Sequence, residues 1–217
     1  MKMRVYDLFA GTGSSTAAFA DAGDDVIRFE MEARFGAEVQ ADVEDLDAAT
    51  LLDQWGRPDF VWASPPCTKF SVARIGRNWE NVRGKLVPRN PETHAALRLV
   101  EHTVRLVAGL APRYGWLMEN PVAALRKTET VRGIPRRTVT YCQYGDSRMK
   151  PTDLFGTVDG WVARPQCAQG APCHEAAPRG ARTGTQGLKN AEERGRVPYD
   201  LGAEIRAAIV AAQEARQ

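Results

Sequence analysis

Continuous apolar runs constrain the fold of this chain more than any other feature. The stretches "RVYDLF", "DVIRFE", "DFVWA" and "YGWLME" are each followed by turn residues or a helical pattern, and a fifth run, "RTVTYCQYG", comes after them. Strands that are apolar on both faces are typical of a parallel sheet covered by helices on both sides. The sequence therefore predicts an α/β fold with a mostly parallel sheet, in which ligands bind at the carboxyl ends of the strands.

Helical patterns fill the segments between and after these runs. Ser14 or Ser15 can cap a first helix, and Asn90 and Pro91 begin a second helix that runs to about residue 110. A closing helix from about residue 199 to 215 carries apolar residues at spacings of four, namely Leu201, Ile205 and Ile209. This spacing places them on one face, which indicates that the closing helix packs back on the sheet.

The size and composition of the chain indicate a globular protein with free thiols. A chain of 217 residues with 43% hydrophobic residues can bury one large core or two small ones. No apolar run approaches the roughly 18 residues that a membrane-spanning helix needs, and the N-terminal stretch "MKMRVYDLF" is too short for a signal peptide. Four cysteines in this length do not indicate a disulfide framework, so we expect a cytoplasmic protein without a membrane partner.

The stretch "DLFAGTGSS" predicts a strand, a glycine turn and the start of a helix. Gly11 and Gly13 let the backbone pass close to a ligand, whereas Thr16 replaces the third glycine of the dinucleotide fingerprint and disfavours a pyrophosphate. Glu30 ends the next strand, where a carboxylate can accept from both hydroxyls of a ribose. Asp42 follows a short third strand and could accept from an adenine amino group. Together these residues favour an adenosine-containing ligand.

The stretch "FVWASPPCTKFS" runs an apolar strand into two prolines and a cysteine. Pro65 and Pro66 fix φ and offer no N–H group, so the strand must stop there. Cys67 is then the first flexible side chain beyond a rigid turn. A lone cysteine is as often a buried structural thiol. Glu30, Cys67 and Glu119, however, all follow or end strands at the same predicted edge of the sheet, which favours a reactive Cys67.

Charge is distributed unevenly along the chain, although the net charge is only +2. Residues 21–53 hold eleven acids against two arginines, whereas residues 69–90 hold six bases against Glu80 alone. A second basic segment spans residues 126–137. Such asymmetry is typical of a protein whose one face meets a polyanion, and it predicts DNA as a partner through these two segments. Solvated loops are the alternative.

Four blocks of the sequence together resemble the cytosine C5 methyltransferases. "DLFAGTGSS" is similar to the first motif of that family, "SPPCTKFS" to its Pro-Pro-Cys motif, and "MENP" to its Glu-Asn-Val motif, with Pro121 in place of the valine. "QYGDSRMKPTDLFG" is similar to the family's arginine block, but the glutamine is absent. In that block Arg148 matches one arginine and Lys150 stands at the place of the other. The blocks occur in family order between residues 7 and 156.

The resemblance implies a Rossmann-like class I fold and the cofactor S-adenosyl-L-methionine. It implies that Cys67 attacks C6 of cytosine, that Glu119 holds or protonates N3, and that Arg148 contacts O2 or braces Glu119. Nearby cations are expected to enlarge the thiolate fraction of Cys67, and the basic segment with Trp79 to close over a flipped base. The residues expected around the cofactor are Asp7, Phe9, Gly11, Gly13, Glu30, Met31, Asp42, Val43 and Pro65. Those expected around the substrate are Pro66, Ser71, Arg74, Arg77, Asn120 and Lys150.

A short insert, residues 157–190, stands where family members of ordinary size carry a target-recognition domain. We expect residues 1–156 to form the catalytic and cofactor-binding core and residues 191–217 to supply the closing helix. The insert has too few large apolar residues to form its own core. Methylation of cytosine in DNA with short or no sequence specificity is therefore favoured, in a bacterial or phage-infected cell, unless a partner or a homodimer supplies recognition. The alternatives are cytosine in a mononucleotide or in RNA, and an inactive homologue that only binds cofactor or DNA.

The insert also contains Cys167, Cys173 and His174, which with Cys142 could ligate zinc. No Cys-x-x-Cys pair is present, and the spacing of these residues fits no usual zinc finger. The sequence alone therefore favours loop residues and a structural thiol over a metal site.

Overall fold

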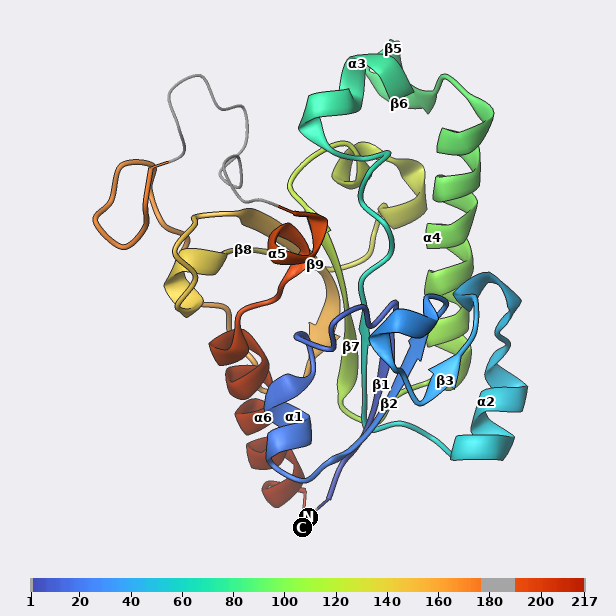
Figure 1. The fold of residues 1–217 in the computed structure, drawn as a ribbon, viewed down its shortest axis with the longest axis vertical. Coiled ribbons are helices and arrows are strands. Elements are labelled where there is room, and N and C mark those ends of the chain that lie inside the picture. The colour runs from blue at the N-terminus through green and yellow to red at the C-terminus, as the bar shows by residue number, and fades with distance from the viewer. Residues whose placement is uncertain (1, 177–189, 217) are drawn as a thin grey trace.

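A seven-stranded sheet forms the centre of the structure, a computed structural model that describes residues 2–176 and 190–216 (Figure 1). The strand order is β3-β2-β1-β4-β7-β9-β8, in which β9 is antiparallel to both of its neighbours and the other pairs are parallel. The strands are β1 (Arg4–Leu8), β2 (Asp25–Glu30), β3 (Val39–Gln40), β4 (Phe60–Ala63), β7 (Gly115–Pro121), β8 (Arg136–Thr140) and β9 (Pro151–Val158).

Helices cover both faces of this sheet. The α-helices are α1 (Ala17–Asp21), α2 (Ala48–Trp55), α3 (Ile75–Asn78), α4 (Pro91–Leu110), α5 (Ala191–Gly195) and α6 (Tyr199–Glu214). Helices α1 and α6 pack together on one face, and α2 and α4 pack together on the other (Figure 1). Within the described chain no helix is both long and apolar enough to cross a membrane.

The two faces explain why the strands are apolar along their whole length. In β4, Val61 and Ala63 pack into the core beneath α2 and α4, whereas Phe60 and Trp62 pack into the core beneath α1 and α6. Successive residues of a strand point to opposite faces, so a strand in the middle of a three-layer fold needs an apolar residue at every position. The prediction of a mostly parallel α/β sheet is confirmed.

Shorter elements connect this framework. The 3₁₀ helices are η1 (Ala33–Phe35), η2 (Val43–Asp45), η3 (Val72–Arg74), η4 (Leu125–Lys127), η5 (Glu129–Val131) and η6 (Tyr141–Tyr144). The first basic segment forms an antiparallel hairpin of β5 (Trp79–Val82) and β6 (Lys85–Pro88). Neither this hairpin nor β9 is apparent from the sequence pattern, and the run "RTVTYCQYG" is a strand only as far as Thr140, after which it continues as η6.

The long helix and the closing helix form as predicted, but the first helix begins differently. Helix α1 starts at Ala17, its N-cap residue is Thr16, and no side chain caps it. The expectation that Ser14 or Ser15 caps this helix is wrong because both hydroxyls have other partners. Ser15 Oγ donates to Asp7 Oδ2 at 2.7 Å, and Ser14 Oγ accepts from the backbone N of Val197 at 3.1 Å.

Candidate active site

A cavity of about 350 Å³ opens at the carboxyl ends of β1, β2, β4 and β7. It contains most of the residues expected around a cofactor together with two of those expected to react, Cys67 and Glu119. The expected cofactor residues that line it are Phe9, Gly11, Glu30, Met31, Asp42, Val43 and Pro65. One cavity therefore joins the adenosine-type residues to the candidate nucleophile.

The glycine turn and Glu30 are connected by hydrogen bonds to the carboxylate. Oε2 of Glu30 accepts from the backbone N of Gly11 at 2.9 Å, and Oε1 accepts from the backbone N of Glu32 at 2.9 Å. Gly11 has φ +50°, a conformation that glycine adopts without strain. Each carboxylate oxygen keeps a second lone pair, so Glu30 can hold the turn and still accept from a ligand in the cavity.

Asp7 and Gly13 do not line the cavity, although both were expected at the cofactor. Asp7 is fully buried, and its Oδ2 accepts from the hydroxyls of Ser15 and Thr16 at 2.7 Å each. Burial raises the pKa of Asp7 to about 6, and the two hydroxyl bonds oppose that rise. Gly13 has φ +72°, and an added Cβ would lie 3.3 Å from Cδ of Arg28. Both residues therefore shape the turn.

The C-terminal segment forms one wall of the cavity, which no sequence motif indicated. Glu192, Gly195 and Val197 line it, and Val197 is held to the glycine turn by its bond to Ser14. Arg34, which follows β2 and also lines the cavity, forms ion pairs with Glu32 and Glu192. The C-terminal segment and the glycine turn, which lie far apart in the sequence, therefore meet at the residues expected to bind the cofactor.

Cys67 lies immediately beyond the proline turn that ends β4. Nδ2 of Asn120, on the neighbouring strand β7, donates to the carbonyl of Pro65 at 3.3 Å and so fixes this turn. Burial, and then the negative charge of Glu119, raise the pKa of the Cys67 thiol, and Lys150 acts in the opposite direction. Nearby bases therefore favour the thiolate as expected, but in the protein alone burial and Glu119 outweigh them.

Glu119, Tyr141 and Lys150 form a buried polar cluster behind Cys67. The Tyr141 hydroxyl donates to Oε1 of Glu119 at 3.1 Å, and Nζ of Lys150 lies 3.6 Å from the same oxygen. Burial raises the pKa of Tyr141 well above its usual value, so its hydroxyl stays a donor. Lys150 also lies over the Tyr141 ring at 4.4 Å and has φ +27°, a strained conformation of a kind that clusters at functional sites.

The structure places Lys150, rather than Arg148, beside Glu119. Arg148 does not line the cavity; its guanidinium forms a salt bridge with Glu175 at 3.0 Å and donates to the carbonyls of Glu175 and Ala176 at 3.3 and 3.2 Å. The reason is local, since Lys150 directly precedes β9 whereas Arg148 lies in the preceding turn, against the insert. The direct role expected for Arg148 at the base or at Glu119 is therefore not supported.

The four remaining residues expected around the substrate differ in their exposure and in their distance from the cavity. Pro66 lines the cavity beside Cys67, and Ser71 is partly buried, with its hydroxyl 3.5 Å from the carbonyl of Thr68. Arg74 and Arg77 are exposed and form no salt bridge with any residue of the described ranges.

Trp79 belongs to the core of the first basic segment, the segment that was expected to close over a flipped base. Its side chain is buried, its Nε1 donates to the carbonyl of Lys69 at 2.8 Å, and its ring lies 5.7 Å from that of Phe70. The hairpin is therefore anchored by Trp79 and presents its arginines to solvent.

The second basic segment, residues 126–137, is largely neutralised within the protein. Arg126 is paired with the buried carboxylate of Asp153, Arg136 lies 3.7 Å from the same residue, and Arg132 pairs with Glu129 at 2.8 Å. The expected polyanion contact therefore rests mainly on the first basic segment.

The strand order, with antiparallel β9 between β7 and β8, and the cavity at the carboxyl edge define a Rossmann-like methyltransferase fold. A model of the C-5 cytosine-specific DNA methylases matches residues 3–120. A probable DNA (cytosine-5)-methyltransferase of Frog virus 3 (isolate Goorha) is 33% identical over 177 residues, which cover 79% of this chain and 78% of the viral protein. The chain belongs to the C-5 cytosine-specific DNA methylase family, and its cofactor is S-adenosyl-L-methionine.

One solved structure agrees on the fold. The Entamoeba histolytica methyltransferase EhMeth aligns with a TM-score of 0.51 at 12% identity, over 72% of this chain and 52% of that one. The S. pombe Dnmt2 methyltransferase aligns with a TM-score of 0.46 at 12% identity, over 76% of this chain and 52% of that one. This chain therefore spans about half the length of either structure.

Proposed function

We propose that this protein transfers a methyl group from S-adenosyl-L-methionine to C5 of cytosine in DNA, through a covalent bond between Cys67 and C6, with short or no sequence specificity. One observation carries the proposal. Cys67 and Glu119 line the same cavity as Glu30 and Asp42, so a methyl donor bound by the acidic residues lies next to the nucleophile.

The residues around Cys67 supply what attack on cytosine needs. The cofactor supplies an electrophilic methyl group on a positively charged sulfonium. That positive charge favours the Cys67 thiolate and so opposes the rise in pKa that burial and Glu119 cause. As Cys67 ionises, its proton passes to the Glu119 carboxylate. Bond formation between Cys67 and C6 pushes electrons toward N3 of the ring, where Glu119 donates that proton, and C5 becomes nucleophilic.

The remaining steps restore the ring and the enzyme. C5 takes the methyl group and S-adenosyl-L-homocysteine leaves. A base then removes the C5 proton, the bond between Cys67 and C6 breaks as the double bond re-forms, and N3 returns its proton to Glu119. Lys150 and Tyr141 hold the Glu119 carboxylate in place through the cycle. The Asn120 bond to Pro65 keeps Cys67 at the end of a rigid turn.

DNA is supported as the substrate by the exposed arginines that follow Cys67. Arg74, Arg77 and Arg83 lie on or beside the hairpin segment and are exposed, so they can contact phosphates on either side of an extruded base. Beyond the end of β9 at Val158, residues 159–176 of the insert contain no buried residue and no helix or strand, which supports short or absent sequence specificity. A reducing, cytoplasmic compartment would keep Cys67 a free thiol. The formation of a homodimer that supplies target recognition stays a prediction.

Trapping with a 5-fluorocytosine substrate tests this proposal. Fluorine at C5 cannot leave as a proton, so the adduct should accumulate on Cys67 and be located there by mass spectrometry. Duplex DNA, single-stranded DNA, RNA and dCMP, each with labelled cofactor, identify the substrate class. We expect methyl transfer to DNA, none by Cys67→Ser, and full transfer by the control variant Glu92→Gln, whose side chain is exposed on α4. An adduct on Cys142, or activity of Cys67→Ser, would refute the covalent mechanism, and transfer to RNA or dCMP alone would replace DNA as the substrate.

A further inference from the structure

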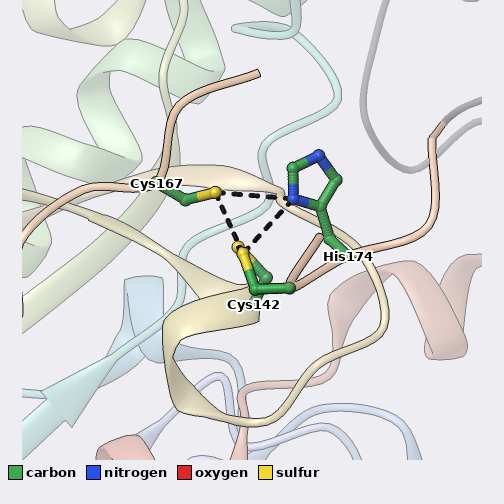
Figure 2. A group of neighbouring side chains, drawn as sticks. Cys142, Cys167 and His174 are labelled. Carbon is green, nitrogen blue, oxygen red and sulfur yellow. Dashed lines mark hydrogen bonds between the residues drawn. The ribbon is translucent and has the colours of Figure 1, made fainter. Parts of the chain in front are cut away.

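Three cysteines and a histidine meet outside the cavity described above. Cys142 lies on η6, directly after the end of β8, and Cys167, Cys173 and His174 lie in the insert. Their ligand atoms, three Sγ and Nδ1 of His174, all lie within 4.8 Å of one another. Figure 2 shows the side chains of Cys167 and His174 pointing toward Cys142.

Three of the distances between these atoms fit tetrahedral coordination, and a fourth, between Sγ of Cys167 and Sγ of Cys173, is shorter. Bonds of about 2.3 Å to sulfur and about 2.0 Å to nitrogen place ligands of a tetrahedral zinc ion about 3.8 Å (S to S) and about 3.5 Å (S to N) apart. Sγ of Cys173 lies 3.8 Å from Sγ of Cys142 and 3.6 Å from Nδ1 of His174. Sγ of Cys167 lies 3.4 Å from the same nitrogen and 3.1 Å from Sγ of Cys173, and all four cysteines are free.

The surrounding contacts also suit thiolate ligands. Nε2 of Gln143 donates to Sγ of Cys173 at 3.4 Å, as outer partners of metal ligands do. The backbone N of Cys167 donates to Oγ1 of Thr140 at 2.8 Å and fixes that ligand beside η6. The Cys167 thiol now donates to the carbonyl of Ala168 at 3.1 Å; metal binding would release its proton to solvent.

Such a crosslink would suit the insert, because little apolar packing holds it: beyond β9, only Trp161 and Ala163 of its described residues pack against the core, and both are partly buried. From residue 159 to 176 no side chain is buried and no helix or strand forms. Apart from the cluster, its contacts are mainly polar, such as those of Arg164 with Glu204 and of Arg148 with Glu175. A metal ion with four protein ligands supplies the ordering free energy that a small core would supply elsewhere.

We propose that Cys142, Cys167, Cys173 and His174 bind one zinc ion, which fastens the insert to the segment that carries Tyr141 and Lys150. Three thiolates and one imidazole are a donor set that selects zinc, and four protein ligands leave no open position, so the ion is structural. Cys142 directly follows Tyr141, whose hydroxyl bonds Glu119, so the crosslink lies one residue from the catalytic cluster.

Metal content of the full-length protein tests this directly. After purification without chelators, we expect inductively coupled plasma mass spectrometry to find about one zinc ion per chain. Cys173→Ser and His174→Ala should each lose it, whereas Cys67→Ser and His94→Ala should keep it. Cys142 is buried and its variants can misfold, so the exposed Cys173 and the partly exposed His174 carry the test. Gln143→Leu should weaken zinc binding about 10- to 100-fold.

Reconstitution distinguishes a metal site from a redox pair. Reduced, metal-free protein titrated with cobalt(II) should develop the absorption bands of a tetrahedral thiolate complex, and zinc should displace them. Removal of the ion should speed hydrogen exchange of the amides from 167 to 176. Failure of the reduced wild-type protein to bind either ion, unchanged zinc content in both Cys173→Ser and His174→Ala, or a disulfide between Cys167 and Cys173 in place of metal would overturn the proposal. None of these readouts depends on methyltransferase activity.

Discussion

Nζ of Lys150 lies 3.6 Å from Oε1 of Glu119, and each of these side chains is only 9% exposed. The pair connects β7 to the residue that precedes β9, and both charges act on the thiol of Cys67. Glu119 raises the pKa of Cys67 and Lys150 lowers it. The nucleophile, the acid and the cation therefore form one electrostatic unit, and each can be tested through its effect on the thiol.

Glu119→Gln should abolish methylation and yet make Cys67 more reactive toward an alkylating agent. The substitution removes the negative charge that raises the pKa of Cys67. At a fixed pH below that pKa the thiolate fraction should rise. Iodoacetamide labelling, followed on the Cys67 peptide by mass spectrometry over a pH series, measures it. Glu92→Gln, an exposed carboxylate on α4, is the control, and a slower reaction in Glu119→Gln would contradict the assigned electrostatics.

Lys150→Met should lower methylation by about 10- to 100-fold and slow the alkylation of Cys67. The variant leaves Glu119 without its cation and removes the charge that lowers the pKa of Cys67. Arg148→Met is the matched comparison, because its side chain contacts the insert. Rates of methyl transfer with saturating DNA compare the two. If Arg148→Met is the more damaging and leaves zinc content unchanged, Arg148 must reach the base in the substrate complex.

Glu30→Ala should weaken S-adenosyl-L-methionine binding by roughly 1.5–3 kcal/mol, because it removes charge-assisted hydrogen bonds. Part of this loss comes from the turn, since Glu30 also accepts from the backbone N of Gly11. Glu30→Gln keeps one acceptor oxygen, so its affinity for S-adenosyl-L-methionine should lie between those of the wild type and Glu30→Ala. Isothermal titration calorimetry measures the affinities, with Glu80→Gln as an exposed control. Equal affinity in Glu30→Ala and the wild type would remove Glu30 from the site.

Neutralising Arg74 and Arg77 to glutamine should weaken binding to all DNA sequences alike. Each phosphate contact that is lost should reduce the slope of log affinity against log salt by about one. Lys2→Gln with Arg57→Gln is a control of equal charge, because both residues are exposed and lie beside Met3 and Asp59 at the amino ends of β1 and β4. Fluorescence anisotropy over a salt series separates the pairs. Equal slopes for the two double variants would show that the first basic segment is only a solvated loop.

Asp7→Asn should stabilise the protein increasingly as pH rises. Burial raises the pKa of Asp7 from 3.8 to about 6, so the folded state holds this proton more tightly than the unfolded chain does. That contribution is present in full below about pH 4 and is lost as pH rises through 6. The difference in unfolding free energy between variant and wild type should grow over this window by up to about 3 kcal/mol. Urea unfolding at several pH values measures it; a difference that does not change with pH would show that Asp7 titrates normally.

Residues at strand ends were the part of the site that the sequence could predict. Glu30, Cys67 and Glu119 come from three different strands, yet the parallel-sheet pattern alone placed them at one edge, and the structure confirms that they share a cavity. Tyr141 was missed, although β8 ends at the same edge, because it stands inside an apolar run and was interpreted as strand. The same rule applied to "RTVTY" would have found it.

Contacts made between segments distant in the sequence could not be predicted. Arg148 carries the family resemblance, but the preference for Lys150 beside Glu119 depends on how the turn before β9 enters the sheet. The pairing of Arg126 with buried Asp153 likewise joins η4 to β9. Neither the cavity wall formed by the C-terminal segment nor the cluster of Cys142, Cys167, Cys173 and His174 has a characteristic spacing along the chain, so both become visible only in three dimensions.

Strand β9 inserts between β7 and β8, both of which precede it in the chain, and among the described residues β8 pairs with β9 alone. As the chain leaves the ribosome, Glu119 and Tyr141 therefore emerge before the strand that joins them. The sheet must keep an open edge at β7 until about residue 158 has been synthesised, and such an edge can pair with other chains. A nascent chain that stops before β9 would possess the glycine turn, Cys67 and Glu119, but no strand would hold Tyr141 beside Glu119. Completion of the catalytic site therefore coincides with closure of the sheet.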